Sequence, residues 1–298
     1  MVAMLPFGTD PVPPYIALPI AAILLIGISL LGYRVIPSRW RPLQAFLTLP
    51  LAASVGMTTV GVVVWTVGAV IGTTTAILLA VAMMVAGLTA AKMWWWDVRV
   101  LARRVSALLR HNLLLAGLGL ATVALAVPQL LLPVVDSDGL RYHLALAKLY
   151  LLEGRVVFYP WDVHAAFPQA VEAVQMLGLR AAGGEVAKFL HFGAFLGALV
   201  VLMLLVHHHR ASRRAAVCAP WFFAASPAAL AASGAAFIDF FVVFHVGVAA
   251  LLARFRANPL LIGIALAGAL SSKWSAAPAV AGLVLLVWAR ERFRPGAL

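Results

Sequence analysis

Long uninterrupted apolar segments dominate this chain of 298 residues, and they constrain its fold more than any other feature. Hydrophobic residues make up 64% of the chain and charged residues 11%, which is less than half the charged share of soluble domains. A soluble globule could not cover so much apolar surface with so few charges. The segments are long and do not alternate between apolar and polar residues, so they predict an all-α, polytopic membrane protein rather than a β-barrel.

About 20 apolar residues in a row are long enough to cross a bilayer as a helix. By this criterion we predict about nine spans, at residues 15–33, 44–66, 72–91, 113–133, 186–206, 215–232, 236–254, 258–272 and 276–289. We divide the chain into a three-span N-terminal segment, 1–112, and a transmembrane core, 113–298. The first 14 residues contain no basic residue, so we expect the first apolar stretch to be a retained helix and not a signal peptide.

The distribution of charge predicts the orientation of these spans. With the N-terminus outside, the segments that follow spans one, three, five, seven and nine hold 16 of the 22 lysines and arginines. Only Asp97 and Glu291 of the acidic residues lie with them, so each of these segments is net positive, as cytoplasmic loops are. The net charge of +12 therefore indicates topology in the cytoplasmic membrane, and we do not expect nucleic acid as a partner.

The largest predicted extramembrane region is residues 134–185, on the outer side. Residues 138–154 have apolar side chains at helical spacing, with Asp138 as the expected N-cap and Gly154 directly after the last turn. Residues 167–182 are also apolar. If they crossed the membrane, the basic segment 207–214 would lie outside, against the rule that basic segments are cytoplasmic. We therefore expect two amphipathic juxtamembrane helices along the outer surface.

Ionisable side chains gather on this predicted outer side. Asp136 and Asp138 directly follow the fourth span, where a carboxylate can act as a general base toward a hydroxyl group. Arg141 and Lys148 are near in sequence and can hold a phosphate. On spacing alone, a helix cap and a solvated loop residue explain the two aspartates better than catalysis does.

Charged residues at the outer ends of other spans shift the balance toward a functional site. Asp239, Lys188 and Lys273 lie where ionisable groups are costly and usually functional, and Glu172 adds a carboxylate in the second outer helix. Snorkelling of the side chain explains each lysine alone, but it explains Asp239 within FIDFF less well. His191 lies near the same end, although a core hydrogen bond is the default role of a lone histidine in a span.

The runs DSDGLRYHLALAKLYLLEG, FYPWDVHAAFPQAVEAV and EVAKFLHF, followed by AAFIDFF and GALSSKWSAAP, resemble glycosyltransferases of the GT-C superfamily. More narrowly, the chain resembles bacterial membrane transferases of the family-39 type, which use polyprenyl-phosphate sugars. The resemblance covers roughly residues 113–290 in order. The residues at matching motif positions are Asp136, Asp138, Tyr142, His143, Lys148, Phe167, Pro168, Glu172, Asp239, Lys273 and Trp274.

The resemblance implies an inverting transfer of a sugar from polyprenyl phosphate to an acceptor hydroxyl at the outer membrane face. Asp136 or Asp138 would deprotonate the acceptor, and Arg141, Lys148 and Lys273 would stabilise the departing lipid phosphate. The other substrate-binding candidates are Tyr142, His143, Glu172, Lys188, His191 and Asp239.

The resemblance fixes no cofactor. It leaves open a divalent cation at the acidic pair, which some members of the superfamily bind and others do not need. The expected partners are the lipid-linked donor and membrane lipids, with a partner subunit as a further candidate because the chain is short.

Two other functions are alternatives to sugar transfer, and three further sequence features are explained without a catalytic role. A non-catalytic GT-C-like subunit that scaffolds a larger complex is the main alternative, and a transporter ranks third because paired broken helices are not evident. We interpret HHH at 207–209 as a helix-end cap and WWW at 94–96 as an interfacial anchor. The basic segment 97–111 fits a solvated amphipathic helix and a lipid-headgroup site equally well.

Overall fold

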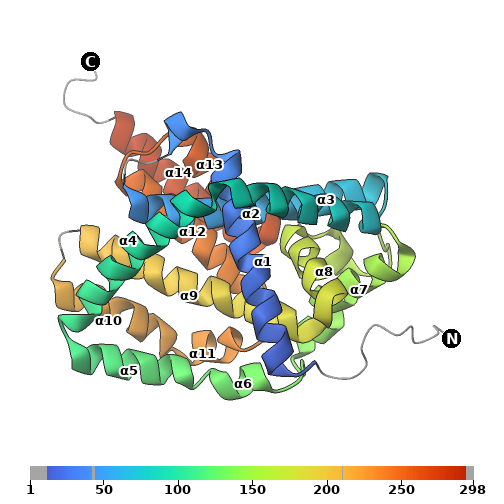
Figure 1. Ribbon diagram of the computed structural model, residues 1–298, viewed down its shortest axis with the longest axis horizontal. Coiled ribbons are helices and arrows are strands. Elements are labelled where there is room, and N and C mark those ends of the chain that lie inside the picture. Colours follow the sequence, from blue (N-terminus) through green and yellow to red (C-terminus); the bar gives the residue numbers. More distant parts are fainter. Residues whose placement is uncertain (1–11, 42–43, 210, 293–298) are drawn as a thin grey trace.

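The computed structural model describes residues 12–41, 44–209 and 211–292, and Asp10, Arg210 and Arg294 of the topology prediction lie outside them. The fold is all-helical, with 84% helix and no strand in the described ranges (Figure 1). The α-helices are α1 (Pro14–Val35), α2 (Ala45–Val70), α3 (Thr73–Ala86), α4 (Ala91–Arg110), α5 (Leu113–Ala124), α6 (Val127–Leu131), α7 (Leu144–Glu153), α8 (Ala170–Ala182), α9 (Gly184–His208), α10 (Arg213–Ala224), α11 (Pro227–Ser233), α12 (Asp239–Arg254), α13 (Pro259–Ser272) and α14 (Ala277–Arg292). Short 3₁₀ turns cover Ser38–Trp40, Gly87–Ala90, Val163–Ala166 and Trp274–Ala276, and a π-helical turn covers Gly139–His143.

Five helical stretches of the described chain are long and apolar enough to cross a membrane, and they indicate a membrane protein. They are Pro14–Val35, Phe46–Val70, Thr73–Arg110, Leu113–Leu131 and Gly184–His208. The pair α10 and α11 makes a sixth candidate, although its axis bends by 71°. The bend has a local cause, because Ser226 accepts the N–H of Ala229 and Pro227 begins a new helix.

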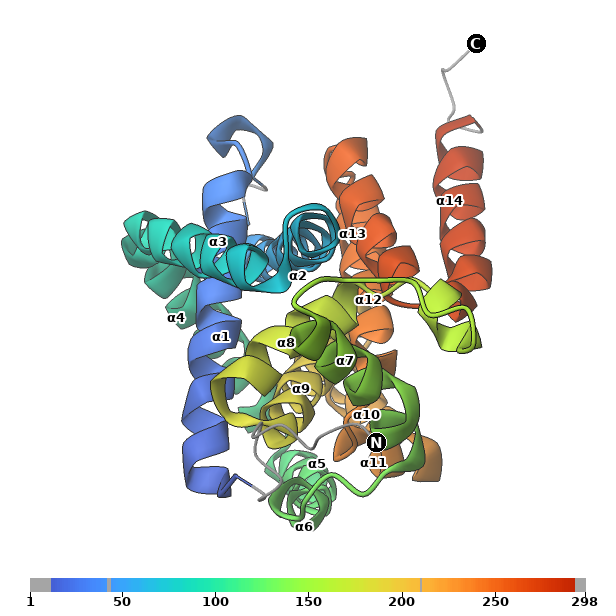
Figure 2. The ribbon, with the colours of Figure 1, turned by 90° about the vertical axis from the view of Figure 1, so that its right-hand side faces the viewer.

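The last three predicted spans correspond to shorter helices. α12, α13 and α14 contain 16, 14 and 16 residues. A helix of the length of α13 rises ~21 Å, which is less than the ~30 Å hydrocarbon core of a bilayer. Figure 2 shows α2 close to end-on while α1, α13 and α14 stand upright, so the helices do not all run in one direction. The count of nine spans stays a prediction.

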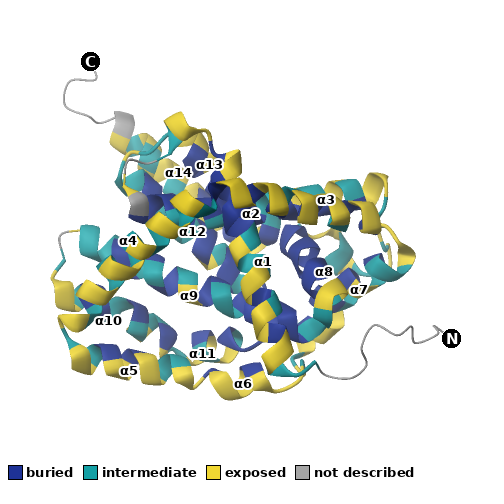
Figure 3. Cartoon of the chain, in the orientation of Figure 1, coloured by how far each residue is buried: buried dark blue, intermediate teal, exposed yellow. Residues whose placement is uncertain are grey.

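Large apolar side chains cover the outer faces of several helices. Leu78, Val81 and Val85 of α3 and Leu114 and Leu118 of α5 are all exposed, and Figure 3 shows the exposed faces of these two helices. Apolar patches of this extent are rare on soluble monomers, whereas lipid tails solvate them without cost. The exposed apolar surface and the long apolar helices thus both indicate a membrane protein.

One hydrophobic core extends across the predicted boundary between residues 112 and 113. α9 lies at its centre, between α1 on one side and α12 on the other (Figure 2). α2 packs against α8 and α13, and the fully buried Leu51 of α2 and Leu190 of α9 belong to the same cluster. The N-terminal segment and the later helices are therefore packed as one body.

Of the predicted helix at residues 167–182, residues 170–182 form α8, and most of this helix is buried inside the protein. All residues from 170 to 178 are buried, because α2, α7 and α9 pack around the helix (Figure 3). The prediction of a helix is confirmed, and its position along the outer surface of the membrane stays a prediction. The helix packs against protein on most sides instead of presenting one apolar face to lipid. The apolar composition that suggested a membrane span reflects burial within the protein.

α1 and α2 cross in backbone contact at Gly32 and Gly56. A Cβ at Gly32 would lie 1.8 Å from the carbonyl oxygen of Ala52, and one at Gly56 would lie 1.9 Å from that of Ile28. We expect Gly32→Ala to destabilise the protein by about 1–3 kcal/mol, because the two helices must separate. Thermal unfolding in detergent measures the effect. Gly117→Ala is the matched control, since nothing lies within 4 Å of its added methyl group, and equal midpoints for both variants would contradict this packing.

Candidate functional site

Asp136 fixes the turn that precedes α7. Its Oδ1 accepts the N–H of Gly139 at 2.6 Å, and its Oδ2 accepts the N–H of Ala236 at 3.1 Å. A Cβ at residue 139 would lie 2.2 Å from Oδ1, so this close approach requires glycine. Asp136 therefore joins the turn before α7 to the segment before α12, and its two oxygens are occupied.

Asp138 occupies the predicted N-cap position, but its side chain makes no capping hydrogen bond. Its backbone is already helical and its side chain caps no N–H, because Asp136 accepts the N–H at the start of the turn. Asp138 is instead partly exposed and accepts the hydroxyl of Tyr142 at 3.2 Å. The predicted end of this helix is confirmed, since Gly154 follows α7 in the left-handed region with φ 72°.

Tyr142 lies at the centre of a group of carboxylates. Burial raises the pKa of its phenol above the ordinary value of 10.0, and the charges of Asp138, Asp239 and Glu172 raise this pKa further. The phenol therefore keeps its proton and donates to Asp138 at physiological pH. On the other side, the ring of His164 stacks on the ring of Tyr142 with 4.0 Å between centroids.

His143 and Glu172 form a buried pair that ties the π-helical turn to α8. Their atoms Nδ1 and Oε1 are 2.8 Å apart, and the side chains are 2% and 6% exposed. Glu172 lies in the first turn of α8, where the helix dipole favours negative charge. Its second oxygen, Oε2, is buried and receives no hydrogen bond from the described residues.

Asp239 and Lys273 meet because α12 and α13 are packed, consecutive helices joined by a short loop. Asp239 is the first residue of α12, and Lys273 directly follows α13, so both lie at the same end. Their Oδ1 and Nζ atoms are 2.8 Å apart, and the side chains are 45% and 31% exposed. A helix start beside a lysine explains how the apolar FIDFF sequence tolerates an aspartate.

His191 positions the start of α12. It is fully buried, its Nδ1 lies 3.0 Å from the carbonyl oxygen of Ala235, and its Nε2 accepts the N–H of Phe240 at 3.1 Å. These two bonds define a neutral imidazole with its proton on Nδ1. Both ring nitrogens are engaged, and His191 thereby holds the backbone of Phe240, the residue after Asp239.

Lys188 holds the end of α6. Its Nζ donates to the backbone carbonyls of Gln129 and Leu132, the latter at 2.7 Å. Lys188 and Asp136 also line a small cavity of about 130 Å³ beside α6. Lys188 is therefore a buried residue near Asp136 that binds the backbone at the end of α6.

Arg141 and Lys148 are exposed and make no hydrogen bond or ion pair with another described residue. The two side chains are therefore free to meet an anionic group.

The acidic pair does not have the geometry of a cation site. Both oxygens of Asp136 accept backbone N–H groups, and Oδ2 of Asp138 accepts a phenol. Within the described ranges, no three histidine, cysteine or acidic side chains gather as metal ligands do. The donors of Asp136 and Asp138 thus do not fit the divalent cation that the resemblance left open.

The loop of residues 155–169 covers Tyr142 and adds a pair that the sequence analysis missed. Nδ1 of His164 lies 2.7 Å from Oδ1 of Asp162, which also accepts the backbone N–H of His164 at 2.9 Å. The sequence DVH, which spaces the acid and the imidazole two residues apart, is the signal that could have identified them. Their stacking on Tyr142 could not be derived from spacing.

Tyr150 anchors this loop from α7. Its hydroxyl donates to Oε1 of Gln169 at 2.6 Å, and Nε2 of Gln169 donates to the carbonyl of His164 at 3.0 Å. Burial raises the pKa of Tyr150 from 10.0 to about 12. Because the unfolded chain releases this proton first, the stability from the neutral phenol is complete below pH 10 and is lost as the pH rises to 12.

We therefore expect Tyr150 to lower the free energy of unfolding by about 1.4 kcal/mol per pH unit within this window. Tyr150→Phe should remove that part of the slope. Thermal unfolding in detergent across the window measures it, and an unchanged slope in the variant would contradict the assignment.

Comparison with known proteins finds no matching family model, no matching curated protein and no matching solved structure. The chemistry of the site therefore follows from its own geometry. A partly exposed carboxylate receives a hydrogen bond from a protonated phenol, and the acid of an acid–lysine pair lies within electrostatic range of the same phenol. Such an arrangement can accept a proton and hold an anion within one site.

Proposed function

We propose that the chain is an inverting membrane glycosyltransferase that moves a sugar from polyprenyl phosphate to an acceptor hydroxyl. One observation carries the proposal. Asp138, Asp239 and the lysine paired with Asp239 come from distant parts of the sequence and gather around Tyr142. The order of the motifs in the sequence supports the same conclusion.

Asp138 is the base in this proposal. Its Oδ2 is held by Tyr142, whereas its Oδ1 accepts, among the described residues, only the hydroxyl of Ser137 at 3.5 Å. Oδ1 takes the proton of the acceptor hydroxyl, and the hydroxyl oxygen forms its new bond to the anomeric carbon of the donor. The bond from that carbon to the phosphate oxygen breaks on the opposite face, and its electron pair leaves with the lipid phosphate.

Lys273, Arg141 and Lys148 receive the phosphate as it gains negative charge. Asp239 orients Lys273 through the 2.8 Å contact, and the two exposed cations of the turn and α7 supply further donors. Cations placed where charge develops stabilise the transition state more than the ground state. His143, Glu172, Lys188 and His191 position these groups rather than contacting the reacting atoms.

The proposed setting is the cytoplasmic membrane, with about nine spans, a GT-C-like arrangement and the site on the outer side. α9 supports this setting because its start lies beside the site and its end lies among arginines. Its 25 residues give a length of ~37 Å, enough to separate the two ends by a bilayer. The arginine-rich end is then the cytoplasmic one.

Mass spectrometry of lipid bound to the purified protein tests the proposal. We expect a polyprenyl-phosphate sugar, and we expect Lys273→Gln to lower its occupancy. Lys92→Gln, which removes a lysine from α4, is the matched control and should retain the lipid. Stoichiometric partner chains without any lipid-linked sugar would instead support the scaffold subunit.

A further inference from the structure

We propose that a cavity at the arginine-rich end of α9 binds the phosphate-bearing headgroup of an anionic membrane lipid, independently of sugar transfer. The cavity has a volume of about 500 Å³. Its polar lining comes from three helices, with Arg103 and Arg104 on α4, His207 and His208 on α9, and Arg213 on α10. These helices converge near one edge of the molecule in Figure 1.

The lining carries three guanidinium groups and no carboxylate. The ion pairs of the described residues join histidine or lysine to acids elsewhere, so Arg103, Arg104 and Arg213 have no acidic partner among them. Both Arg104 and Arg213 lie within electrostatic range of His207. Converging cations of this kind repel one another unless an anion lies between them.

Arg104 is held in place before any ligand binds. Its guanidinium lies 4.0 Å from the ring centroid of Phe46, and its Nη1 lies 3.2 Å from Nε2 of His208. Arginine can only donate, so Nε2 is the acceptor and the imidazole of His208 is neutral. Arg254 donates to the carbonyl of His208 at 2.8 Å and fixes the helix end. The cavity is thus preorganised for an acceptor such as phosphate.

His207 supplies a second observation that points to a ligand. Its Nδ1 is buried and has no hydrogen-bond partner among the described residues, although the side chain lines the cavity. Buried polar atoms are nearly always paired, so an unpaired nitrogen beside three arginines indicates a missing polar partner. An oxygen of a phosphate group matches it.

The surface of α4 identifies a lipid as the source of the phosphate. Trp95 and Trp96 are 52% and 58% exposed, and the guanidinium of Arg99 lies 5.7 and 5.6 Å from their ring centroids. Exposed tryptophans with arginines on an amphipathic helix are typical of the membrane interface. Arg103 lies one turn further along, so the cavity opens at the level of the headgroups. Basic pockets between helices at this depth bind anionic lipids.

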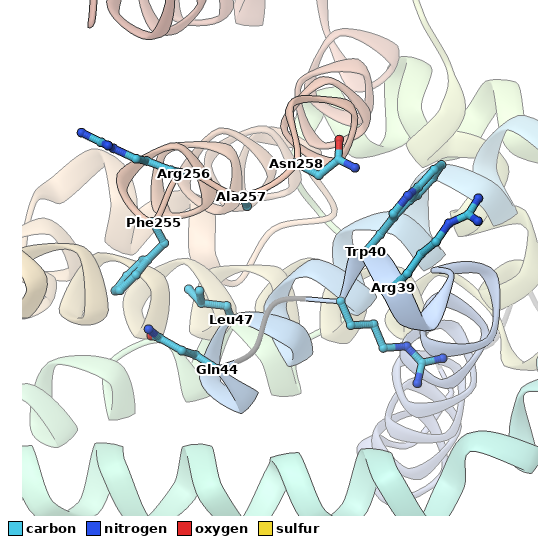
Figure 4. A pocket seen from close by; sticks show the side chains of 9 residues that line it. Arg39, Trp40, Gln44, Leu47, Phe255, Arg256, Ala257 and Asn258 are labelled. Carbon is cyan, nitrogen blue, oxygen red and sulfur yellow. The ribbon is translucent and has the colours of Figure 1, made fainter. Parts of the chain in front are cut away.

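A second basic cavity, of about 300 Å³, is a weaker candidate (Figure 4). Its arginines do not converge, because Arg39 and Arg256 extend to opposite sides in Figure 4. Arg41 is already engaged, since it donates to the backbone carbonyls of Tyr33 at 2.6 Å and Ile36 at 3.3 Å. The first cavity therefore carries the inference alone.

Native mass spectrometry of the full chain in detergent tests this site with cardiolipin, phosphatidylcholine and pyrophosphate as probes. The test variant is Arg103→Gln with Arg213→Gln, because both side chains are exposed and Arg104 is needed for packing. The control is Arg99→Gln with Arg110→Gln, which removes the same charge from α4 outside the cavity. We expect the test pair to weaken cardiolipin binding about 100-fold, because each of the two arginines supplies a charge-assisted hydrogen bond to the bound phosphate.

The control pair should weaken cardiolipin binding several-fold less, and phosphatidylcholine should bind all variants alike. Unfolding midpoints equal to that of the native chain would show that the test pair is folded. Equal loss of cardiolipin in both pairs would overturn the proposal in favour of a diffuse surface charge. Displacement of cardiolipin by pyrophosphate at equal concentration would overturn the lipid assignment and indicate a site for soluble phosphate compounds.

Discussion

Asp138→Asn should lower the rate of sugar transfer in membranes by about 10²–10⁴-fold, the usual contribution of a positioned general base. The amide keeps an oxygen that accepts the hydroxyl of Tyr142, so the turn before α7 should stay intact. The variant loses the ability to take a proton. Transfer from a radiolabelled polyprenyl-phosphate sugar, with the unfolding midpoint of the same sample, measures both properties together.

Two further variants make this result specific. Glu153→Gln removes an exposed carboxylate from the end of α7 and should leave the rate unchanged. Asp136→Asn should lower the unfolding midpoint, because only one of its two acceptor oxygens remains for the backbone N–H groups. A full rate in Asp138→Asn, or equal losses in all three variants, would remove Asp138 as the base.

Glu172→Ala should destabilise the protein by about 1–3 kcal/mol, because it leaves Nδ1 of His143 buried without its hydrogen-bond partner. The pair lies between the π-helical turn and α8 and is almost fully buried. Its loss frees the turn that carries Asp138. Thermal unfolding in detergent measures the change as a shift of the midpoint.

Asp162→Ala is the matched control for burial. It removes the acid of a pair with nearly the same distance, 2.7 Å, whose side chains are 24% and 15% exposed. Solvent weakens such a pair, so we expect a loss of about 1 kcal/mol. Similar losses in the two variants would show that burial of the His143–Glu172 pair does not determine its strength.

The sequence predicts the features that depend on local pattern. Apolar length predicts the first spans, and Gly154 predicts the end of α7, because each depends on neighbouring residues. Charge in costly positions at the ends of predicted spans singles out Asp239, Lys188 and Lys273, and the structure pairs Asp239 with Lys273. This last prediction rests on the free-energy cost of a charged side chain inside a membrane span, and not on a sequence motif.

Long-range contacts determine what the sequence does not predict. The structural role of Asp136 depends on the N–H of Ala236, which lies 100 residues further along the chain. The burial of α8 depends on three other helices, and apolar composition alone fits both a span and a buried helix. The stacking of His164 on Tyr142 depends on the path of a loop that has no periodic pattern.

A structure of the protein with a bound polyprenyl-phosphate sugar is the most direct measurement of the central proposal. We expect the donor phosphate beside Lys273 and Arg141, with the anomeric carbon facing Oδ1 of Asp138 and space between them for an acceptor hydroxyl. A donor bound away from the group around Tyr142, or with Asp138 on the side of the leaving phosphate, would contradict it.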